Sequence, residues 1–108
     1  MSYNIEVTAL FEKQLKRLTK KFPSLKKEFG YLIVSLKEKP NQGTSIGNHC
    51  YKIRLAISSK GKGKSGGARV ITYIQVVQEK IYLLTIYDKS EQSDMNDKEL
   101  KNLTDSIS

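Results

Sequence analysis

The chain has 108 residues, and its 19 Lys and Arg residues outnumber its 11 Asp and Glu residues, which gives a formal net charge of +8. The length suits one small domain over residues 1–108, and the apolar runs are far shorter than the ~20 residues that a membrane-spanning helix needs. The single cysteine, Cys50, excludes an internal disulfide, and the first residues lack the apolar core of a signal peptide. We therefore expect a cytoplasmic protein that does not bind membranes.

The first third of the chain predicts a strand followed by a helical hairpin. Residues 2–7 favour a short strand, and Thr8 is placed to cap the helix after it. Phe22-Pro23-Ser24 interrupts the helical pattern, because proline disfavours helical geometry in the residue before it, and Ser24 can cap a second helix that ends before Pro40. Two apolar stripes at helical spacing mark the packed faces: Phe11, Leu15 and Leu18, then Leu25, Phe29, Leu32, Ile33 and Leu36.

Three strands are predicted after a loop over residues 41–49. The first, Tyr51 to Ile57, alternates apolar residues with Lys52, Arg54 and Ala56. Residues 68–77 and 80–87 then form an antiparallel hairpin around Gln78-Glu79. Both of these strands are apolar on both faces, so the centre of the sheet should be covered on both sides.

The end of the chain predicts a closing helix. Asn96 can cap it, and Leu100, Leu103 and Ile107 share one face. The resulting order is β-α-α-β-β-β-α. This order is typical of an α+β fold, with an N-terminal strand and helical hairpin, a mainly antiparallel twisted sheet and a C-terminal helix.

Positive charge is concentrated in the middle of the chain. Residues 39–80 hold eight Lys or Arg residues and one acid, whereas residues 81–108 hold three and six. The segment 60–69, Lys-Gly-Lys-Gly-Lys-Ser-Gly-Gly-Ala-Arg, predicts a mobile basic loop, which suits phosphate binding. We expect a polyanionic partner, with nucleic acid first, an anionic membrane second and an acidic protein compatible with either. The contacts are expected from Lys60, Lys62 and Lys64.

The tripeptide Gly63-Lys64-Ser65 is similar to the end of a nucleotide-binding P-loop, but the rest of the motif is missing. Ser58 stands where that motif needs a glycine, and a predicted strand follows where it needs a helix. An NTPase is therefore excluded.

Lys52 and Arg54 alternate on one strand face, and Arg69 begins the next strand, so these three cations converge if the strands pair. RNA cleavage by a 2′-hydroxyl needs a base, cations that stabilise the charge on phosphorus, and an acid for the leaving 5′ oxygen. Arginine suits the phosphate, and a lysine crowded by cations can act as base. The residues alone slightly favour a simpler interpretation, a solvated strand face.

Other reactive side chains are interpreted as structural. His49 and Cys50 are single and adjacent, which favours neither a metal site nor a nucleophile–base pair. Asp88, Glu91 and Asp94 follow the last strand and could hold a divalent cation, but such a cluster more often complements a helix dipole. We predict no metal and no cofactor.

Three stretches together resemble the RelE/ParE superfamily of bacterial toxins. They are Cys50-Tyr-Lys-Ile-Arg-Leu55, the basic loop with Ala68-Arg-Val-Ile-Thr-Tyr73, and Tyr82-Leu-Leu-Thr-Ile-Tyr-Asp-Lys-Ser-Glu91. The Lys-rich loop and the Leu-Leu-Thr-Ile-Tyr strand are most similar to the HigB-like branch of type II toxin–antitoxin systems. The resemblance covers nearly the whole chain and implies a RelE-like fold.

The resemblance implies a ribosome-dependent mRNA endonuclease that stops translation and is held inactive by a cognate antitoxin. In HigB-like systems that antitoxin typically carries a helix-turn-helix domain. Members like RelE use a metal-free cluster of Lys and Arg on the concave face of the sheet. Lys52, Arg54 and Arg69 match that cluster by position.

The rest of the family pattern maps less directly. Tyr87, Lys89 and Glu91 are the nearest candidates for its further cation and tyrosine, but Met95 and Asn96 stand where a tyrosine is expected. The general acid and base are therefore unassigned. Three alternatives stay open: a ParE-like inhibitor of DNA gyrase, a non-enzymatic nucleic-acid-binding module, and an inert basic structural protein.

Overall fold

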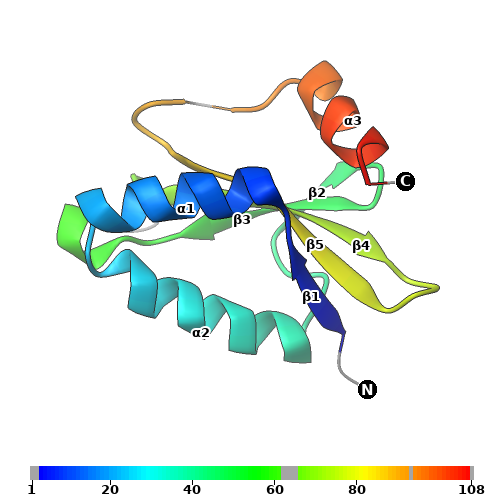
Figure 1. The fold of residues 1–108 in the computed structure, drawn as a ribbon, viewed down its shortest axis with the longest axis horizontal. Helices are drawn as coiled ribbons and strands as arrows, with labels where there is room; N and C mark the ends of the chain where they lie inside the picture. The colour runs from blue at the N-terminus through cyan, green and yellow to red at the C-terminus, as the bar shows by residue number, and fades with distance from the viewer. Residues whose placement is uncertain (1–2, 62–65, 93, 108) are drawn as a thin grey trace.

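The computed structural model describes residues 3–61, 66–92 and 94–107. Its elements follow the predicted order with one additional strand (Figure 1). They are β1 (Asn4–Val7), α1 (Ala9–Lys21), α2 (Leu25–Glu38), β2 (Thr44–Gly47), β3 (Cys50–Leu55), the short 3₁₀-helix η1 (Ser58–Lys60), β4 (Ala68–Gln75), β5 (Lys80–Asp88) and α3 (Asp97–Asp105). No helix in the described ranges is long and apolar enough to cross a membrane.

The strands form one five-stranded sheet in the order β1-β5-β4-β3-β2. Neighbours among β2, β3, β4 and β5 are antiparallel, and only β1 runs parallel to its neighbour β5. The predicted α+β fold with a mainly antiparallel sheet is therefore confirmed. The two hairpins β2–β3 and β4–β5 supply two of the three antiparallel pairs, while the helical hairpin separates β1 from the strands that follow it.

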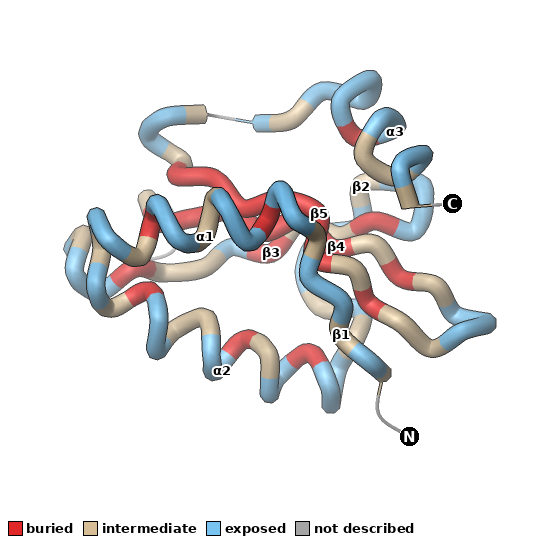
Figure 2. Tube along the Cα trace, viewed as in Figure 1, coloured by how far each residue is buried: buried red, intermediate tan, exposed pale blue. Residues whose placement is uncertain are grey.

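Apolar side chains are buried on both faces of the sheet, as the sequence predicted for its two most apolar strands. Figure 2 shows buried residues along the central strands and along the helices. On one face, the two long helices cover a core that includes Phe11, Leu18 and Val70. On the other face, Leu100 of α3 packs in a smaller cluster. That cluster consists of Cys50, Ile71, Leu84, Tyr87 and Leu100.

Two of the three predicted helix caps make the expected hydrogen bond. Thr8 Oγ1 accepts from the backbone N–H of Phe11 at 3.1 Å, and Asn96 Oδ1 accepts from that of Glu99 at 2.8 Å. Ser24 lies at the start of α2 but makes no cap bond. Its hydroxyl instead accepts from Ser59 N at 2.9 Å, so it ties α2 to η1.

The segment 41–49 was predicted as a loop, and this prediction is wrong in part, because residues 44–47 form β2. Asn48 and His49 both have positive φ angles, 54° and 62°, and form the two-residue turn between β2 and β3. The short, mostly polar strand carries almost no apolar alternation, so the sequence pattern does not reveal it. The second strand of the β4–β5 hairpin begins as predicted, but β4 ends at Gln75 and leaves Val77 98% exposed in the turn.

Beyond Leu83, which pairs with Val7, no strand among the described residues pairs with the outer edge of β5, and side chains at the start of α1 supply hydrogen bonds there. The Gln14 side-chain oxygen accepts from Ile86 N at 3.0 Å and from the Thr85 hydroxyl at 2.9 Å. The Thr8 hydroxyl donates to Leu83 O at 3.0 Å. These bonds fix α1 along the last half of β5, which matters for the sites described below.

Candidate active site

The strand register brings the main predicted cations to one face of the sheet. Arg54 of β3 lies opposite Arg69 of β4, and Arg69 lies opposite Tyr87 of β5. Residues directly opposite in antiparallel strands point to the same face, so these three form a row across the sheet. Lys52, two residues before Arg54, lies on this same face. The convergence inferred from strand alternation is therefore present in the fold.

Arg69 and Tyr87 are the buried part of this row. Each is 5% exposed, and Arg69 Nη1 donates to the carbonyl of Ala68 at 3.1 Å. Burial raises the pKa of the Tyr87 hydroxyl, the charge of Asp94 raises it further, and the Arg69 cation opposes both. The Tyr87 hydroxyl is also buried without a hydrogen-bond partner among the described residues. Tyr87 therefore stays protonated at neutral pH and has an O–H available to donate.

Lys52 and Arg54 form the accessible part of the site. Arg54 is exposed, and the Lys52 side chain is 25% exposed. Lys52 Nζ lies 3.4 Å from Asp94 Oδ1. A hydrogen bond from Met95 N and the charges of Lys52 and Lys89 hold the pKa of the Asp94 carboxyl below its ordinary value, against the effect of desolvation.

Asp94 is the site residue whose position sequence reasoning missed. The sequence suggests Asp94 only as a possible ligand of a divalent cation, with Asp88 and Glu91. The segment between β5 and α3 instead carries it back to the cationic face, where its carboxylate contacts Lys52. Lys52 therefore already contacts one anionic group on this face.

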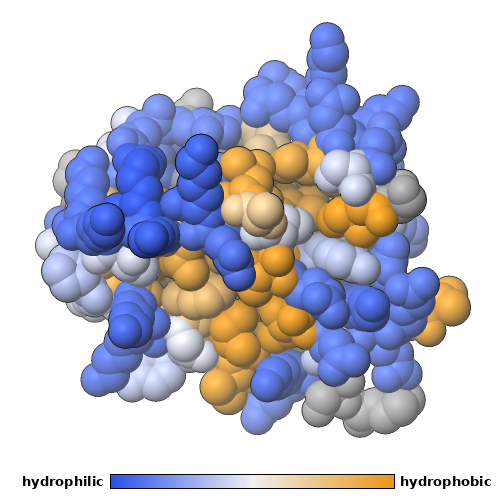
Figure 3. Space-filling model, in the orientation of Figure 1, coloured by the Kyte–Doolittle hydropathy of each residue, from blue (hydrophilic) through white to orange (hydrophobic). Residues whose placement is uncertain are grey.

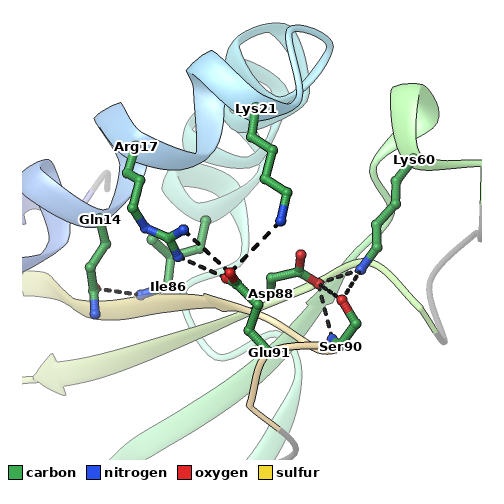
Figure 4. A network of polar contacts seen from close by, with 8 residues as sticks. All are labelled: Gln14, Arg17, Lys21, Lys60, Ile86, Asp88, Ser90 and Glu91. Atoms are coloured by element: carbon green, nitrogen blue, oxygen red, sulfur yellow. Dashed lines mark hydrogen bonds and ion pairs between the residues drawn. The ribbon is translucent and has the colours of Figure 1, made fainter.

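The structure does not bring Glu91 into this group, which corrects its predicted place in the site. Glu91 Oε1 lies 2.7 Å from Arg17 Nη2, and Lys21 Nζ lies 3.7 Å from Glu91 Oε2, so its carboxylate is directed toward α1 (Figure 4). Lys89 stays near the site, because its charge acts on Asp94. Its backbone N–H donates to Gly67 O at 3.0 Å, which joins the end of β5 to the start of β4.

Lys60 was predicted to extend from a basic loop toward a polyanion, but its side chain is mostly buried against Asp88. Its ammonium donates to Oδ1 of Asp88, whose side chain is fully buried, and to Ser90 Oγ at 3.0 Å (Figure 4). The Lys60 side chain is only 9% exposed, so it is a structural ion-pair partner rather than a solvent-facing lysine. Lys62 and Lys64 lie outside the described residues.

Asp88 is ionised in this buried position. Burial alone would raise the pKa of its carboxyl, but hydrogen bonds from Lys60 and Ser90 outweigh that effect and leave the pKa below its ordinary value. Asp88 lies opposite Ala68, immediately beside the Arg69–Tyr87 pair. The Lys60–Asp88 pair therefore fixes the strand ends from which Arg69 and Tyr87 extend.

Cys50 and His49 were both interpreted as structural, and they differ in burial, since Cys50 lies in the core and His49 is exposed. Cys50 is fully buried, and burial raises the pKa of its thiol to about 11, so little thiolate forms at neutral pH. His49 lies in the β2–β3 turn, and its carbonyl accepts from Ile74 N at 2.9 Å. The described residues contain no group of three or more His, Cys, Asp or Glu placed to hold a metal ion.

The fold resembles solved structures of bacterial toxins. A mutant of E. coli toxin RelE in the free state aligns over 86% of this chain and 90% of its own, with 16% identity and a TM-score of 0.63. The intact E. coli RelBE toxin–antitoxin complex gives 14% identity and a TM-score of 0.60, over 81% of this chain and 96% of that chain. The RelBE2 toxin–antitoxin complex from Mycobacterium tuberculosis gives 13% and 0.50, over 82% and 99%.

A family model described as the RelE toxin of the RelE/RelB toxin–antitoxin system matches residues 10–107, which is nearly the whole chain. The match includes every element from α1 to α3. The assignment to the HigB-like branch stays a prediction from the sequence. With this match and the RelE-like fold, the chain belongs to the RelE toxin family of toxin–antitoxin systems.

Proposed function

We propose that this protein is a ribosome-dependent endonuclease that cleaves mRNA and so stops translation. The observation that carries the proposal is the row of Arg54, Arg69 and Tyr87 with Lys52 on one sheet face. Three cations beside one protonated tyrosine could supply the charge stabilisation and the proton donor that phosphodiester cleavage needs. A strand face that is merely solvated needs neither. Membership in the RelE toxin family supports the same conclusion.

The proposed reaction is attack of an RNA 2′ oxygen on the adjacent phosphorus, with cleavage of the bond from phosphorus to the 5′ oxygen. Lys52 and Arg54 receive the phosphate at the accessible side, and Arg69 stabilises the charge that builds up on it. Tyr87 donates its proton to the leaving 5′ oxygen, since its raised pKa keeps it protonated. Lys89 supports the charge, and removal of the 2′ proton is not assigned to a residue.

The decisive experiment maps transcript ends in cells that express the wild type or Arg69→Ala. New 5′ ends within translated codons are expected for the wild type, and their rate of appearance should fall on the order of a hundredfold or more in the variant. Thermal unfolding of Arg69→Ala must be measured alongside, because Arg69 is buried. Lys37→Ala, an exposed change on α2, is the control.

The same cells separate the alternative functions. Intact mRNA with DNA damage would replace the nuclease by a ParE-like gyrase inhibitor. Binding to nucleic acid without any cleavage would indicate a non-enzymatic binding module. Growth that neither the wild type nor Arg69→Ala affects would indicate an inert basic protein.

We also propose that Lys62 and Lys64 bind RNA or the ribosome without taking part in the chemistry. Lysines in a glycine-rich sequence suit counterion release on binding better than they suit holding a reacting atom in place. Lys62→Gln with Lys64→Gln should weaken ribosome association and flatten its salt dependence. Lys60 stays unchanged in this variant, because its ion pair with Asp88 is structural. Normal binding with lost cleavage would move these lysines into the active site.

A cognate antitoxin is the proposed inhibitory partner, acting in the cytoplasm. An acidic or amphipathic antitoxin segment across residues 52–69 would pair the exposed cations and block RNA. Two of the solved structures with this fold are toxin–antitoxin complexes, which supports such a partner. Co-expression with the neighbouring open reading frame should restore growth and allow a pull-down. The proposal would be contradicted if the product of the neighbouring gene, with or without a helix-turn-helix domain, neither bound this protein nor restored growth.

A further inference from the structure

A second cationic surface lies on α1, outside the row of Arg54, Arg69 and Tyr87. Its five side chains are all exposed and recur at spacings of three and four, so they share one helix face. They line a groove of about 520 Å³, and Figure 3 shows hydrophilic side chains gathered over α1. We call this surface the α1 stripe, and it consists of Lys13, Lys16, Arg17, Lys20 and Lys21.

The helix that carries the stripe is fixed to the sheet. Phe11 and Leu18 on its inner face are fully buried, and Gln14 accepts two hydrogen bonds from β5. With a rise of about 1.5 Å per residue, the stripe runs roughly 12 Å from Lys13 to Lys21. The α1 stripe is therefore a straight array of cations on a rigid support, with two members on each of its last two turns.

The chemistry of the stripe favours a polyanion over a protein. Protein interfaces have an apolar or aromatic centre and are depleted in lysine, whereas this groove is lined by cations alone among the described residues. Single-stranded RNA is usually held by aromatic side chains that stack on its bases, and the described residues that line the groove include no aromatic side chain. The backbone of an RNA duplex, read by its shape and phosphates, fits these features.

One acidic side chain occupies part of the stripe. Glu91 accepts two hydrogen bonds from Arg17, at 2.7 and 3.3 Å, and lies 3.7 Å from Lys21 (Figure 4). At the end of the stripe, Lys21 lies 5.3 Å from the centre of the Phe22 ring, and Lys60 lies 5.7 Å from it. A phosphate that binds Arg17 and Lys21 has to displace Glu91.

We propose that the α1 stripe binds the phosphate backbone of double-stranded RNA and docks the protein on paired RNA of the ribosome. This inference deepens the proposed function and rests on it for the identification of the ribosome as the RNA-containing partner. The docking surface and the cleavage face are separate, since α1 packs on the sheet face that carries Ile53, whereas Lys52 and Arg54 alternate with Ile53 along β3 and lie on the opposite face.

The test measures binding of an RNA duplex over a range of salt concentrations, in the Arg69→Ala background that avoids toxicity. Changing Lys13, Lys16 and Lys20 to Gln should lower the slope of log affinity against log salt by about 2 to 3, since each lost phosphate contact accounts for about 0.9. At 0.1 M salt the affinity should fall on the order of a hundredfold. The matched control changes three exposed α2 lysines to Gln and should leave both values unchanged: Lys26, Lys27 and Lys37.

Glu91→Gln tests the same surface in the opposite direction. Removing the internal anion frees Arg17 and Lys21, so duplex affinity should rise and its salt dependence should steepen. Equal slopes for the α1 and α2 triple variants, or no effect of Glu91→Gln, would overturn the proposal. The proposal would also be overturned if the α1 triple variant lost binding to polyglutamate but kept binding to the RNA duplex. That result would identify an acidic protein as the partner.

These readouts do not require cleavage. If transcripts stay uncut while duplex binding responds as expected, the proposed nuclease fails and the docking surface stands. If cleavage of mRNA is confirmed while the α1 variants bind normally, only the docking surface fails.

Discussion

Replacing Lys60 by Met should destabilise the protein strongly, because it leaves the Asp88 carboxylate buried without its cationic partner. Asp88 is fully buried on a strand and cannot reach water, and its remaining described hydrogen-bond donors are the N–H and hydroxyl of Ser90, both to Oδ1. Removing one member of a buried ion pair typically costs about 3–5 kcal/mol. The two retained bonds from Ser90 place the expected cost near the lower end, about 3 kcal/mol.

The reciprocal change should cost less. Lys60 lies at the end of a surface 3₁₀-helix, so its ammonium can turn to solvent in Asp88→Asn, and the new amide can keep bonds with Ser90. We expect about 1–2 kcal/mol for Asp88→Asn. The double variant should lose less stability than Lys60→Met alone, because it contains no unpaired buried charge.

Thermal and urea unfolding measure these differences. With an unfolding entropy of about 2.1 cal/mol/K per residue, 3 kcal/mol corresponds to a fall in Tm of about 13 °C. Lys26→Met, an exposed change on α2, is the control and should stay within about 0.5 kcal/mol of the wild type. A loss below about 1 kcal/mol for Lys60→Met, or a larger loss for Asp88→Asn, would refute the reasoning.

Acidification provides an independent check. The pKa of Asp88 is lowered in the folded protein, so its stabilising contribution is present above the unfolded pKa of about 3.9 and is lost as pH falls through the lower folded value. In Lys60→Met, burial without the cation should raise the folded pKa instead. The destabilisation should then diminish as pH falls from 7 toward 4, because Asp88 becomes neutral. A pH-independent difference between the two proteins would contradict the assigned charges.

Three further predictions concern single residues. Gly43→Ala should destabilise by about 1–3 kcal/mol more than Gly47→Ala in urea unfolding, because both glycines have positive φ but only a Cβ at Gly43 would lie 2.6 Å from the Lys52 carbonyl oxygen; equal costs would contradict this reading. Gln14→Leu should lose about 1–3 kcal/mol in the same assay, because the Ile86 N–H loses its acceptor. Tyr87→Phe should leave stability unchanged or raise it by about 1–2 kcal/mol, since the hydroxyl has no described partner, while transcript cleavage falls. Lower stability with normal cleavage would contradict the role of Tyr87 as proton donor.

Local sequence patterns determined most of the secondary structure. The apolar spacing of Phe11, Leu15 and Leu18, the break at Pro23 and the caps at Thr8 and Asn96 depend on interactions within a few residues, so they can be read without the fold. Alternation along 51–57 likewise placed Lys52 and Arg54 together on one face of the strand, opposite to the face of Ile53. Residues 44–47 escaped this reading, because a short polar strand owes its conformation to its partner β3 rather than to its own side chains.

The composition of the candidate site required pairing between distant segments. Sequence order placed Lys60 in a basic loop and Glu91 beside Tyr87, yet the fold pairs Lys60 with buried Asp88 and Glu91 with Arg17 of α1. Successive residues of a strand point to opposite faces, so Asp88 turns away from Tyr87, its neighbour in the chain. Local sequence therefore determined which segments carry charge, and only the tertiary structure decided which charges are neutralised by ion pairs and which stay accessible to a partner.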